Sequence, residues 1–300
     1  MNSVRKCTIL LAVSAIACGC EGGGHVKATK NVPAALRPVA KEASQEELLD
    51  RYNTFARHLQ TVNATVELKT KAGSKYSGVI EDYHEIKAFV LAARPSEIRM
   101  IGQVPVVGKT AFDMASDGQT FEVSIPSKNK FLEGPIAFER ASSKPIENLR
   151  PQHLVEALLW PEVRKEEEVV FEENSDDAAR YYVLTVLRGG YKTEILRRIW
   201  FDRADLNVVR LQGYGAKGAL LSDVRYADWQ PVAAAGSARA AIDDYPRIIR
   251  LDRPRDEYHL DMNVTKITMN EPLGPDRFRL EPPAGAEIVK VGEATEDKKP

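Results

Sequence analysis

Ala64-Thr65-Val66-Glu67-Leu68-Lys69 is a stretch in which apolar and polar residues alternate one by one. The same period of two recurs in residues 121–125 and in residues 258–265. Successive side chains of a β-strand point to opposite faces, so each run predicts a strand with one face on an apolar interior and the other in water. Half-buried strands of this kind are typical of antiparallel sheets.

Further strand-like segments lie around these runs, and turn residues separate them. Gly189-Gly190 stands between two apolar-rich segments and is the clearest hairpin signal. The additional strands are expected near residues 86–93, 98–104, 109–115, 169–173, 181–188, 191–201, 206–212 and 220–229. Roughly ten or more meandering strands predict one strongly curved sheet.

Two helices interrupt the strand pattern. Ser44, with Glu47 three residues later, forms a capping box ahead of a helical apolar spacing. A second helix is expected at about residues 151–160, because Pro151 suits a first helical turn and Pro161 ends it. We expect both helices in the concave side of the sheet. An apolar interior that two short helices do not fill can bind a hydrophobic ligand, whereas ordinary core packing is the alternative.

The N-terminus carries a separate signal. All three cysteines fall within the first twenty residues, after Arg5, Lys6 and a short apolar run. This order is typical of a secretory signal, and the run is too short to span a bilayer. The small residues before Cys resemble the lipobox of bacterial lipoproteins, in which the signal is cut before a Cys that carries acyl chains. We expect lipidation at Cys20, because the Gly-rich residues 21–24 follow as a tether, with Cys18 as the alternative.

Charge and length limit the partners and the domain organisation that the sequence allows. A cut ahead of Cys20 removes two of the 42 basic residues and none of the 43 acidic ones, which leaves a formal net charge of −3. A near-neutral chain of mixed sign gives no electrostatic argument for a nucleic-acid partner, and we expect none. The expected organisation is a signal peptide in residues 1–19, a flexible tether in 20–43, one folded domain in 44–290 and a disordered tail in 291–300.

No signature of catalysis stands out. The sequence has no Gly-x-Ser-x-Gly elbow and no Walker-type phosphate loop. The five histidines have no metal-ligand spacing and stand at positions 25, 58, 84, 153 and 259. We therefore expect no catalytic residue, no metal, no cofactor and no enzymatic activity. Hydrolysis of an envelope polymer would need a paired acid and base that the sequence does not show.

A basic stretch near the C-terminus has two interpretations. Arginines occupy positions 247, 250, 253 and 255, around Pro246 and Pro254, and the acidic Asp252, Asp256 and Glu257 interleave with them. Charge and proline protect the edges of sheets, so this pattern predicts an edge strand. The alternative is a site for a phosphate headgroup or an anionic partner.

Longer patterns resemble a known superfamily. Residues 98–108 read IRMIGQVPVVG, residues 117–126 read DGQTFEVSIP and residues 144–161 read KPIENLRPQHLVEALLWP. Near the C-terminus, residues 269–285 read MNEPLGPDRFRLEPPAG. Together these patterns resemble the LolA/LolB superfamily, which handles lipoproteins in the periplasm of Gram-negative bacteria, and especially its membrane-anchored receptor branch, LolB.

The resemblance implies a mainly β fold: an unclosed antiparallel β-barrel, or half-barrel, with an N-terminal helix and a helical lid over an acyl-chain cavity. It also implies an exposed apolar loop, which is Val106 and Val107 here, where the receptor carries a leucine. Valine is smaller than leucine and this chain is longer than the receptor, so the resemblance leaves the ligand open. The residues expected to line the cavity are Val66, Leu68, Phe112, Met114, Phe121, Val123, Leu154, Leu158, Trp160, Leu260 and Met262.

For function, the resemblance implies a membrane-anchored periplasmic lipoprotein. Such a protein would bind the acyl chains of lipoproteins or lipids and deliver them to the outer membrane, with a soluble LolA-like carrier as a partner. Glu21 after Cys20 is not the Asp that retains lipoproteins at the inner membrane of enterobacteria, which favours the outer membrane, facing the periplasm. The alternative is a structural or regulatory envelope lipoprotein with a filled interior that binds a protein partner.

Overall fold

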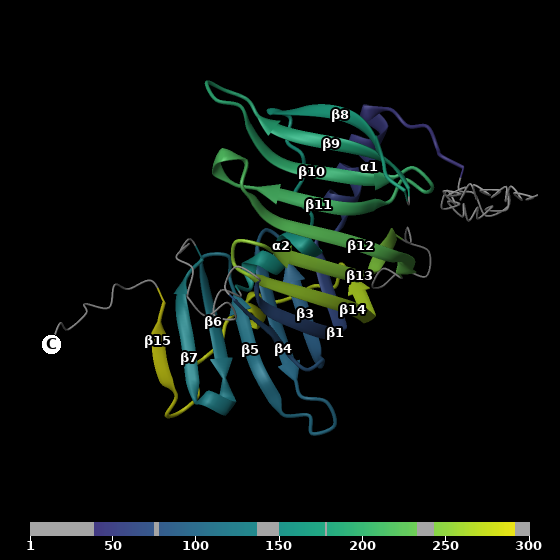
Figure 1. Cartoon of the computed structure of the whole chain (residues 1–300). Helices are drawn as coiled ribbons and strands as arrows, with labels where there is room; N and C mark the ends of the chain where they lie inside the picture. Colours follow the sequence, from purple (N-terminus) through teal and green to yellow (C-terminus); the bar gives the residue numbers. More distant parts are fainter. Residues whose placement is uncertain (1–38, 75–77, 137–149, 178, 233–242, 292–300) are drawn as a thin grey trace, which may run out of the picture. The chain divides into compact units, whose positions relative to one another are not determined.

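Fifteen strands form one sheet in the computed structural model of this chain (Figure 1). The structure describes residues 39–74, 78–136, 150–177, 179–232 and 243–291. The expected signal peptide and both candidate lipidation sites, Cys18 and Cys20, lie outside the described residues. Residues 1–38 separate from the unit that begins at Val39, and everything below concerns that unit.

The first half of the chain contributes the strands on one side of the sheet. They are β1 (Thr61–Ser74), β2 (Val79–Asp82), β3 (Ile86–Ala93), β4 (Glu97–Gln103), β5 (Thr110–Ser116), β6 (Thr120–Ile125) and β7 (Lys130–Pro135). The second half contributes β8 (Glu167–Ser175), β9 (Arg180–Arg188), β10 (Glu194–Asp202), β11 (Val208–Tyr214), β12 (Leu220–Val232), β13 (Asp243–Arg253), β14 (Tyr258–Met269) and β15 (Glu287–Lys290).

The sheet does not close on itself. Its strand order is β15-β7-β6-β5-β4-β3-β1-β14-β13-β12-β11-β10-β9-β8, and β2 pairs with β1 off this path. Every neighbouring pair is antiparallel except β15 and β7, which run parallel. The order leaves one edge at β8 and the other at β15. The prediction of an unclosed, mainly antiparallel β-sheet is confirmed.

Helix α1 (Gln45–His58) begins where the sequence predicts. The Ser44 side chain accepts a hydrogen bond from the Glu47 backbone N–H at 3.2 Å, and the Glu47 carboxylate accepts one from the Ser44 backbone N–H at 2.8 Å. This capping box satisfies two of the N–H groups that a helix start leaves without partners. On its apolar face, Leu48, Tyr52 and Ala56 are buried.

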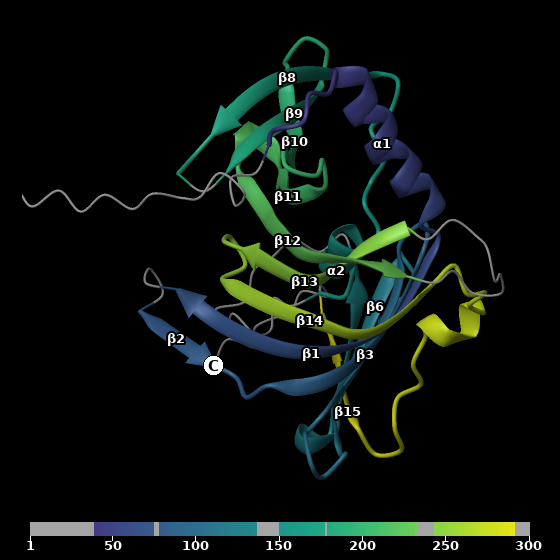
Figure 2. The ribbon, with the colours of Figure 1, turned by 90° about the vertical axis from the view of Figure 1, so that its right-hand side faces the viewer.

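Helix α2 (Gln152–Leu158) is only seven residues long, and the sheet holds both of its ends (Figure 2). Figure 2 shows α2 in the concave side of the sheet, while α1 crosses the half that carries β8 to β11. The hydroxyl of Tyr226 on β12 donates to the Ala157 carbonyl at 3.0 Å, and that of Tyr245 on β13 donates to the Leu158 carbonyl at 3.2 Å. Burial raises the pKa of both tyrosines well above the ordinary value, so they stay protonated donors.

The start of α2 is fixed by a buried polar cluster. His153 Nδ1 lies 2.6 Å from the Tyr258 hydroxyl, and its Nε2 lies 3.2 Å from an Arg253 nitrogen. Burial, followed by the charges of Arg253 and Arg150, lowers the pKa of His153 to about 3. The ring is therefore neutral at physiological pH. Because arginine can only donate, Nε2 accepts and the proton sits on Nδ1, facing the tyrosine.

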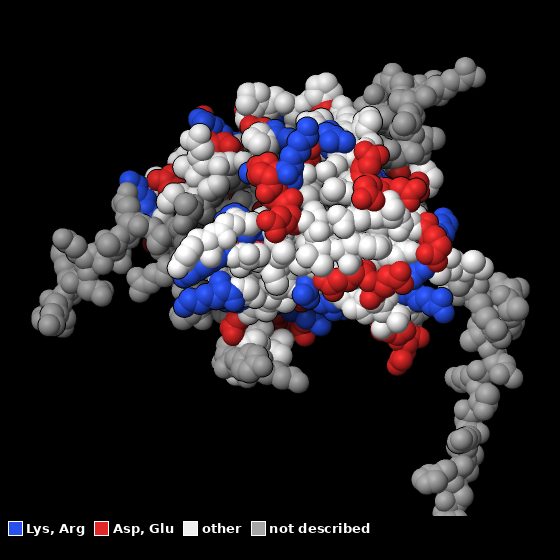
Figure 3. Space-filling view, turned by 90° about the horizontal axis from the view of Figure 1, so that it is seen from above, with Lys and Arg blue, Asp and Glu red and all other residues white. Residues whose placement is uncertain are grey.

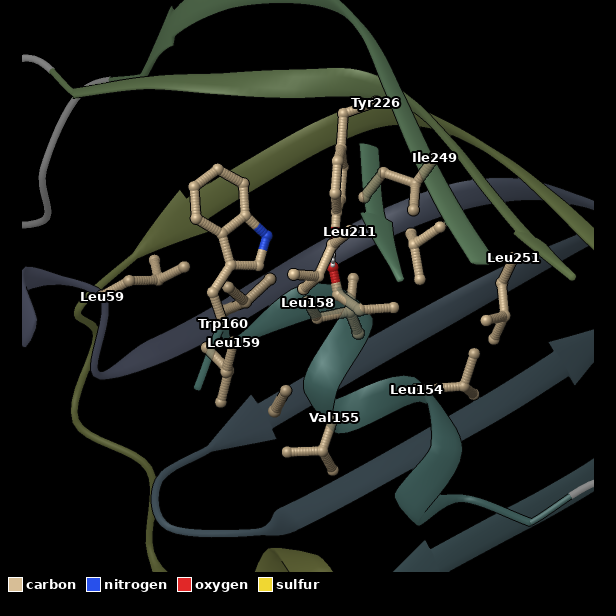
Figure 4. Packing of buried hydrophobic residues seen from close by; sticks show 14 of the residues in the cluster. Leu59, Leu154, Val155, Leu158, Leu159, Trp160, Leu211, Tyr226, Ile249 and Leu251 are labelled. Carbon is tan, nitrogen blue, oxygen red and sulfur yellow. Dashed lines mark hydrogen bonds between the residues drawn. The ribbon is translucent and has the colours of Figure 1, made fainter. Parts of the chain in front are cut away.

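The leucines of α2 point into the sheet. Figure 4 shows Leu154 and Leu158 directed toward the strands that carry Leu211 and Leu251. Both leucines are at most 1% exposed, so α2 fills the concave space with its own side chains. The core of the unit therefore consists of the inner faces of the strands together with one face of each helix.

The prediction of an edge strand in the basic stretch is wrong. Strand β13 pairs with β12 on one side and with β14 on the other. Pro246, which lacks an N–H, is tolerated because its pairing is with β12 alone, since the β14 ladder starts at Ile248. The interleaved charges instead form cross-strand pairs, such as Arg250 with Asp261 at 3.4 Å.

On the neighbouring residues of β13 and β14, a histidine bridges two carboxylates. His259 Nδ1 lies 2.5 Å from Asp252 and Nε2 lies 3.0 Å from Asp261. The hydrogen bond to Asp252 is the largest cause that raises the pKa of His259, and desolvation opposes it. The charged form of His259 is thus stabilised in the folded protein.

We expect this bridge to make stability depend on pH. A raised folded-state pKa adds stability that is fully present below the unfolded pKa of about 6.5 and is lost as the pH rises through the folded pKa. The difference in free energy of unfolding between wild type and His259→Gln should therefore shrink as the pH rises from 6 to 9. Urea unfolding at several pH values measures it. A difference that stays constant or grows over this range would contradict the bridge.

The charges on the surface are mixed in sign. Figure 3 shows acidic and basic side chains on the face seen from above, with an uncharged band between them. This face carries no large field of one sign that would steer a polyanion. Within the described part of the chain, neither helix is long and apolar enough to cross a membrane.

Candidate functional site

The candidate site is a pocket of about 340 Å³ between α1 and the strands β10 to β13. Ligand pockets in proteins commonly occupy about 300–1,000 Å³, so this volume is at the small end. Helix α1 contributes one wall, and the β10–β11 turn contributes another. The lining residues are Asp50, Arg51, Tyr52, Thr54, Phe55, His58, Trp160, Phe201, Leu206, Asn207, Val208, Trp229 and Asp244.

Aromatic rings form the floor of this pocket. Trp160 packs on Phe55 with ring centroids 4.4 Å apart, stacks on Tyr52 at 5.6 Å and meets Trp229 edge-on at 5.7 Å. Tyr52 and Trp160 are nearly completely buried, whereas Phe55 and Trp229 are half-buried. Phe55 and Trp229 are therefore the rings with area left for a ligand to cover. Rings at such distances add stacking energy to the area they bury.

Buried hydrogen bonds hold this floor in place. The Arg94 guanidinium donates to the carbonyls of Ala56 at 2.7 Å, Leu59 at 2.9 Å and Trp160 at 2.7 Å. It thereby satisfies carbonyls at the C-terminal end of α1, which lack helical partners, and ties them to the segment after α2. Burial lowers the pKa of Arg94 from its ordinary value, but an arginine remains charged at any physiological pH.

A second set of bonds joins α1 to the same segment. The Asn53 amide donates to the Val163 carbonyl at 3.0 Å and accepts from the Val163 N–H at 2.8 Å. The Tyr52 hydroxyl donates to the Pro161 carbonyl at 2.8 Å. Helix α1 and residues 160–163 are thus fixed to each other, and the aromatic floor between them is rigid.

The mouth of the pocket is polar. Asp50, Thr54 and His58 lie on the exposed side of α1, and Asp244 is exposed at the start of β13. Arg51 donates to the Asn207 side chain at 3.0 Å and so links α1 to the β10–β11 turn. An apolar floor below a polar rim suits a ligand with an apolar body and a polar end.

Most of the residues predicted to line a cavity belong to the packed core. Nine are at most 2% exposed: Val66, Leu68, Met114, Phe121, Leu154, Leu158, Trp160, Leu260 and Met262. Phe112 and Val123 are partly buried and pack against the core. Trp160 is the member of this set that lines the pocket described above. The other ten do not line it, and their role toward a ligand stays a prediction.

The loop predicted to be exposed is the hairpin between β4 and β5. Val106 is 108% exposed and Val107 is 64% exposed, relative to an extended reference. The hairpin is closed by a hydrogen bond from the Val104 N–H to the Lys109 carbonyl at 2.9 Å. Val106 has a φ of 68°, a conformation that β-branched residues rarely adopt. Strained residues of this kind cluster at functional positions, and here the strain holds an apolar side chain in water.

Four aromatic residues of the pocket were not selected as site residues from the sequence. Tyr52 and Phe55 were interpreted only as the apolar face of a helix, and Trp229 only as the end of a strand. Phe201 lies at the end of β10. The signal available in the sequence was that two of only three tryptophans, Trp160 and Trp229, follow predicted apolar segments. Nothing in their spacing indicates that the two meet.

Among the described residues, no group of three or more His, Cys, Asp or Glu is arranged to hold a metal ion. The pocket mouth contains His58, Asp50 and Asp244, and none of these three forms an ion pair or a hydrogen bond to another of them. Its chemistry is therefore that of apolar contact and polar orientation rather than of a preformed acid–base pair.

Comparison with known proteins gives matches in structure and not in sequence. No family model matches the chain, and neither does any curated protein. A LolA superfamily protein from Nitrosomonas europaea matches with a TM-score of 0.47 and 12% identity, covering 80% of this chain and 99% of that one. The chain is similar in fold to a LolA superfamily protein. A DUF1329 family protein from Desulfovibrio piger also matches, with a TM-score of 0.47 and 12% identity over 77% of this chain and 94% of that one.

A domain from Vibrio parahaemolyticus, described as an outer membrane lipoprotein-sorting protein, matches with a TM-score of 0.46 and 13% identity. It covers 78% of this chain and 95% of its own length. The structures that match thus include the superfamily that the sequence resembles, and a particular likeness to LolB stays a prediction. At these identities and TM-scores, the likeness concerns fold and carries no argument about what this chain binds.

Proposed function

We propose that this protein is a lipid-anchored envelope protein that binds an acyl chain of a lipid or lipoprotein and helps to deliver it to the outer membrane. The observation that carries the proposal is the pocket between α1 and the sheet, with its floor of Phe55, Trp160 and Trp229. Each methylene that leaves water for such a floor gains about 0.8 kcal/mol. The pocket volume suits part of one chain, with the polar end of the ligand at the rim.

The exposed hairpin supports the same proposal. Val106 and Val107 present apolar side chains to water at the tip of the β4–β5 hairpin, where a bilayer surface would cover them. Delivery then requires only a difference in affinity for the acyl chain between the pocket and the bilayer, so no bond is made or broken. Lipidation at Cys20, or at Cys18, would hold the protein at the membrane, and a soluble LolA-like carrier would supply the ligand.

The pocket contains its own reporters. Trp160 and Trp229 line it, whereas Trp200 donates to Gln212 at 3.1 Å and lies under the Arg210 guanidinium at 5.5 Å. A fatty acid brominated along its chain should therefore quench the fluorescence of Trp160 and Trp229 and spare Trp200. The experiment uses the full chain with Cys18→Ser and Cys20→Ser, so that no attached acyl chain competes. Quenching should persist in Trp200→Phe, and no quenching at saturating fatty acid would exclude acyl binding in this pocket.

A pocket-filling change should weaken binding without harming the fold. Thr54 is exposed at the mouth, so Thr54→Phe places a ring in the opening while the core stays intact. We expect the affinity for the brominated fatty acid to fall at least about 10-fold, since blocking a few methylenes costs more than 1.4 kcal/mol. Glu46→Phe, also exposed on α1 but outside the pocket wall, is the matched control and should bind as wild type does. Equal affinities for the two variants would place the ligand elsewhere.

One observation favours the alternative function, a structural or regulatory lipoprotein that binds a protein partner. The residues predicted for a large cavity, such as Leu68 and Met262, are packed rather than open. A protein of this kind would retain no lipid. Mass spectrometry of lipids extracted from the purified full chain separates the two functions, because a carrier retains acyl chains in proportion to protein and a filled scaffold retains none.

A further inference from the structure

A second pocket, of about 420 Å³, lies beside the end of the β12–β13 ribbon. Its wall is polar and comes from three neighbouring strands. The lining residues are Asp228, Gln230, Arg247, Asn263, Val264, Thr265, Lys266 and Ile267. None of these residues lines the aromatic pocket. Trp229, which stands between Asp228 and Gln230 on β12, lines the aromatic pocket instead. Alternation along β12 thus separates two sites of opposite character.

Irregularities in two strands shape this second pocket. On β12, Asp228 has a φ of 56°, in the left-handed region. On the other side, the pairing of β1 with β14 shifts register between Thr65 and Val66, which leaves Thr265 as an extra residue on β14. Bulges of this kind redirect side chains and are common next to functional sites. Asp228 and Thr265 both line the pocket together with Arg247.

Arg247 lacks the partner that neighbouring arginines have. Arg250 pairs with Asp261 at 3.4 Å and Arg253 pairs with Asp256 at 2.7 Å. Across the described part of the chain, no carboxylate oxygen lies within 4.0 Å of a nitrogen of Arg247 or Lys266. The Arg247 Nε is buried and has no hydrogen-bond partner, and its terminal nitrogen reaches only the Pro231 carbonyl at 3.4 Å. The same holds for the Nε of Arg197 and Arg198, so the distinguishing feature of Arg247 is that its charge faces a polar pocket without a carboxylate partner among the described residues.

We propose that this pocket binds a phosphate group, which Arg247 and Lys266 hold by charge-assisted hydrogen bonds. Phosphate oxygens accept from the terminal N–H groups of Arg247, and the Lys266 ammonium balances the negative charge. The amides of Gln230 and Asn263 lie in the same wall. Each already donates one hydrogen bond, to Asp228 and to Glu67 at 2.9 Å, and has a second N–H left for the ligand. The site differs from the acyl pocket in residues and in chemistry, so it stands whether or not an acyl chain binds there.

Asp228 decides which oxyanion fits. Its carboxylate belongs to the same wall and accepts from the Gln230 amide at 2.9 Å. A carboxylate repels an anion unless the anion donates a proton to it. Hydrogen phosphate carries such a proton near neutral pH, whereas sulfate and the phosphodiester of a lipid headgroup carry none. We infer that the ligand is inorganic phosphate rather than sulfate or a phosphodiester.

Calorimetric titration of the full chain, with Cys18→Ser and Cys20→Ser, tests this site with inorganic phosphate and with sulfate at equal ionic strength. We expect phosphate to bind at least about 10-fold more tightly than sulfate. Arg247→Gln should weaken phosphate binding at least about 10-fold and Lys266→Gln less, because Lys266 is exposed. Arg225→Gln removes the same charge from an exposed position of β12 outside the pocket and should bind as wild type does. Asp228→Asn should narrow the preference for phosphate over sulfate.

Other outcomes overturn the proposal. The proposal is wrong if phosphate does not bind, or if it binds to Arg247→Gln and to wild type with equal affinity. Co-sedimentation of the protein with vesicles of phosphatidylglycerol, and with vesicles of phosphatidylcholine for comparison, tests whether the phosphate group belongs to a lipid. Arg247-dependent sedimentation without phosphate binding would assign the pocket to a lipid headgroup and reject free phosphate. If Arg247→Gln does not fold, Arg247→Lys replaces it: this variant keeps the charge but lacks the two terminal guanidinium donors, so its affinity for phosphate should also fall.

Discussion

Replacing Trp160 by alanine is expected to lower the free energy of unfolding by about 3–5 kcal/mol, the usual cost of deleting a buried large aromatic side chain. Its indole is 2% exposed and packs against the rings of Tyr52, Phe55, Tyr226 and Trp229. Figure 4 shows Trp160 beside Tyr226. Four ring contacts would be lost at once, and the rigid segment on which Trp160 stands cannot close the cavity. Equilibrium unfolding in urea at constant pH measures the change.

Trp200→Ala is the control for this substitution. Trp200 is half-buried, and one side of its ring meets the Arg210 guanidinium rather than a packed aromatic floor. Its removal should cost clearly less than that of Trp160 because it leaves less buried space empty. A Trp160→Ala protein that loses no more stability than Trp200→Ala would show that the aromatic floor is not part of the stable core.

The second large effect is expected at Arg94. Substituting methionine keeps the apolar stem and removes the guanidinium, which leaves the carbonyls of Ala56, Leu59 and Trp160 without a donor. Each buried acceptor without a partner costs about 1–3 kcal/mol, and we expect a total loss of about 3 kcal/mol or more in the free energy of unfolding. Thermal and urea unfolding give this number directly.

Quenching by the brominated fatty acid is a second measurement of the role of Arg94. If the guanidinium positions the floor as well as stabilising it, Arg94→Met should weaken quenching of Trp160 at temperatures where the protein is still folded. Arg57→Met is the matched control, since Arg57 is exposed near the end of α1 and its guanidinium makes a 4.0 Å pair with Glu162 and a 3.5 Å hydrogen bond to the Thr54 hydroxyl. Exposed pairs of this type contribute about 0–1 kcal/mol. Equal losses for Arg57 and Arg94 would rule out the bridging role.

Local patterns predicted the elements well, and the pairing of distant elements only in part. The capping box at Ser44 and Glu47 and the hairpin at Gly189-Gly190 are confirmed, because each depends on a few adjacent residues. Strands β2, β7 and β15 were missed, and β2 and β15 have four residues each, too few to show a period. The prediction that β13 is an edge strand was wrong. Proline and charge are typical of an edge strand, but β14 forms a hairpin with β13 and pairs with the side that was expected to be free.

The candidate site was harder to predict than the fold. A period of two indicates which side chains face inward, but it does not tell how completely α2 fills the space they face. The pocket instead depends on Phe55 meeting Trp160 and Trp229, which stand 105 and 174 residues later in the sequence. Arg94 and Asn53 set that meeting through hydrogen bonds to backbone carbonyls, which no residue pattern reveals.

Among the described residues, β8 pairs with β9 alone, so its other side is a sheet edge at which a strand of another chain can pair. Four glutamates stand on this terminal strand, Glu167, Glu168, Glu172 and Glu173. Glu167 and Glu173 pair with Arg197 and Arg203, whereas Glu168 and Glu172 form no ion pair with another described residue. Two β8 strands brought side by side would place these unpaired carboxylates near each other, and their repulsion disfavours the joining of two sheets into a fibre.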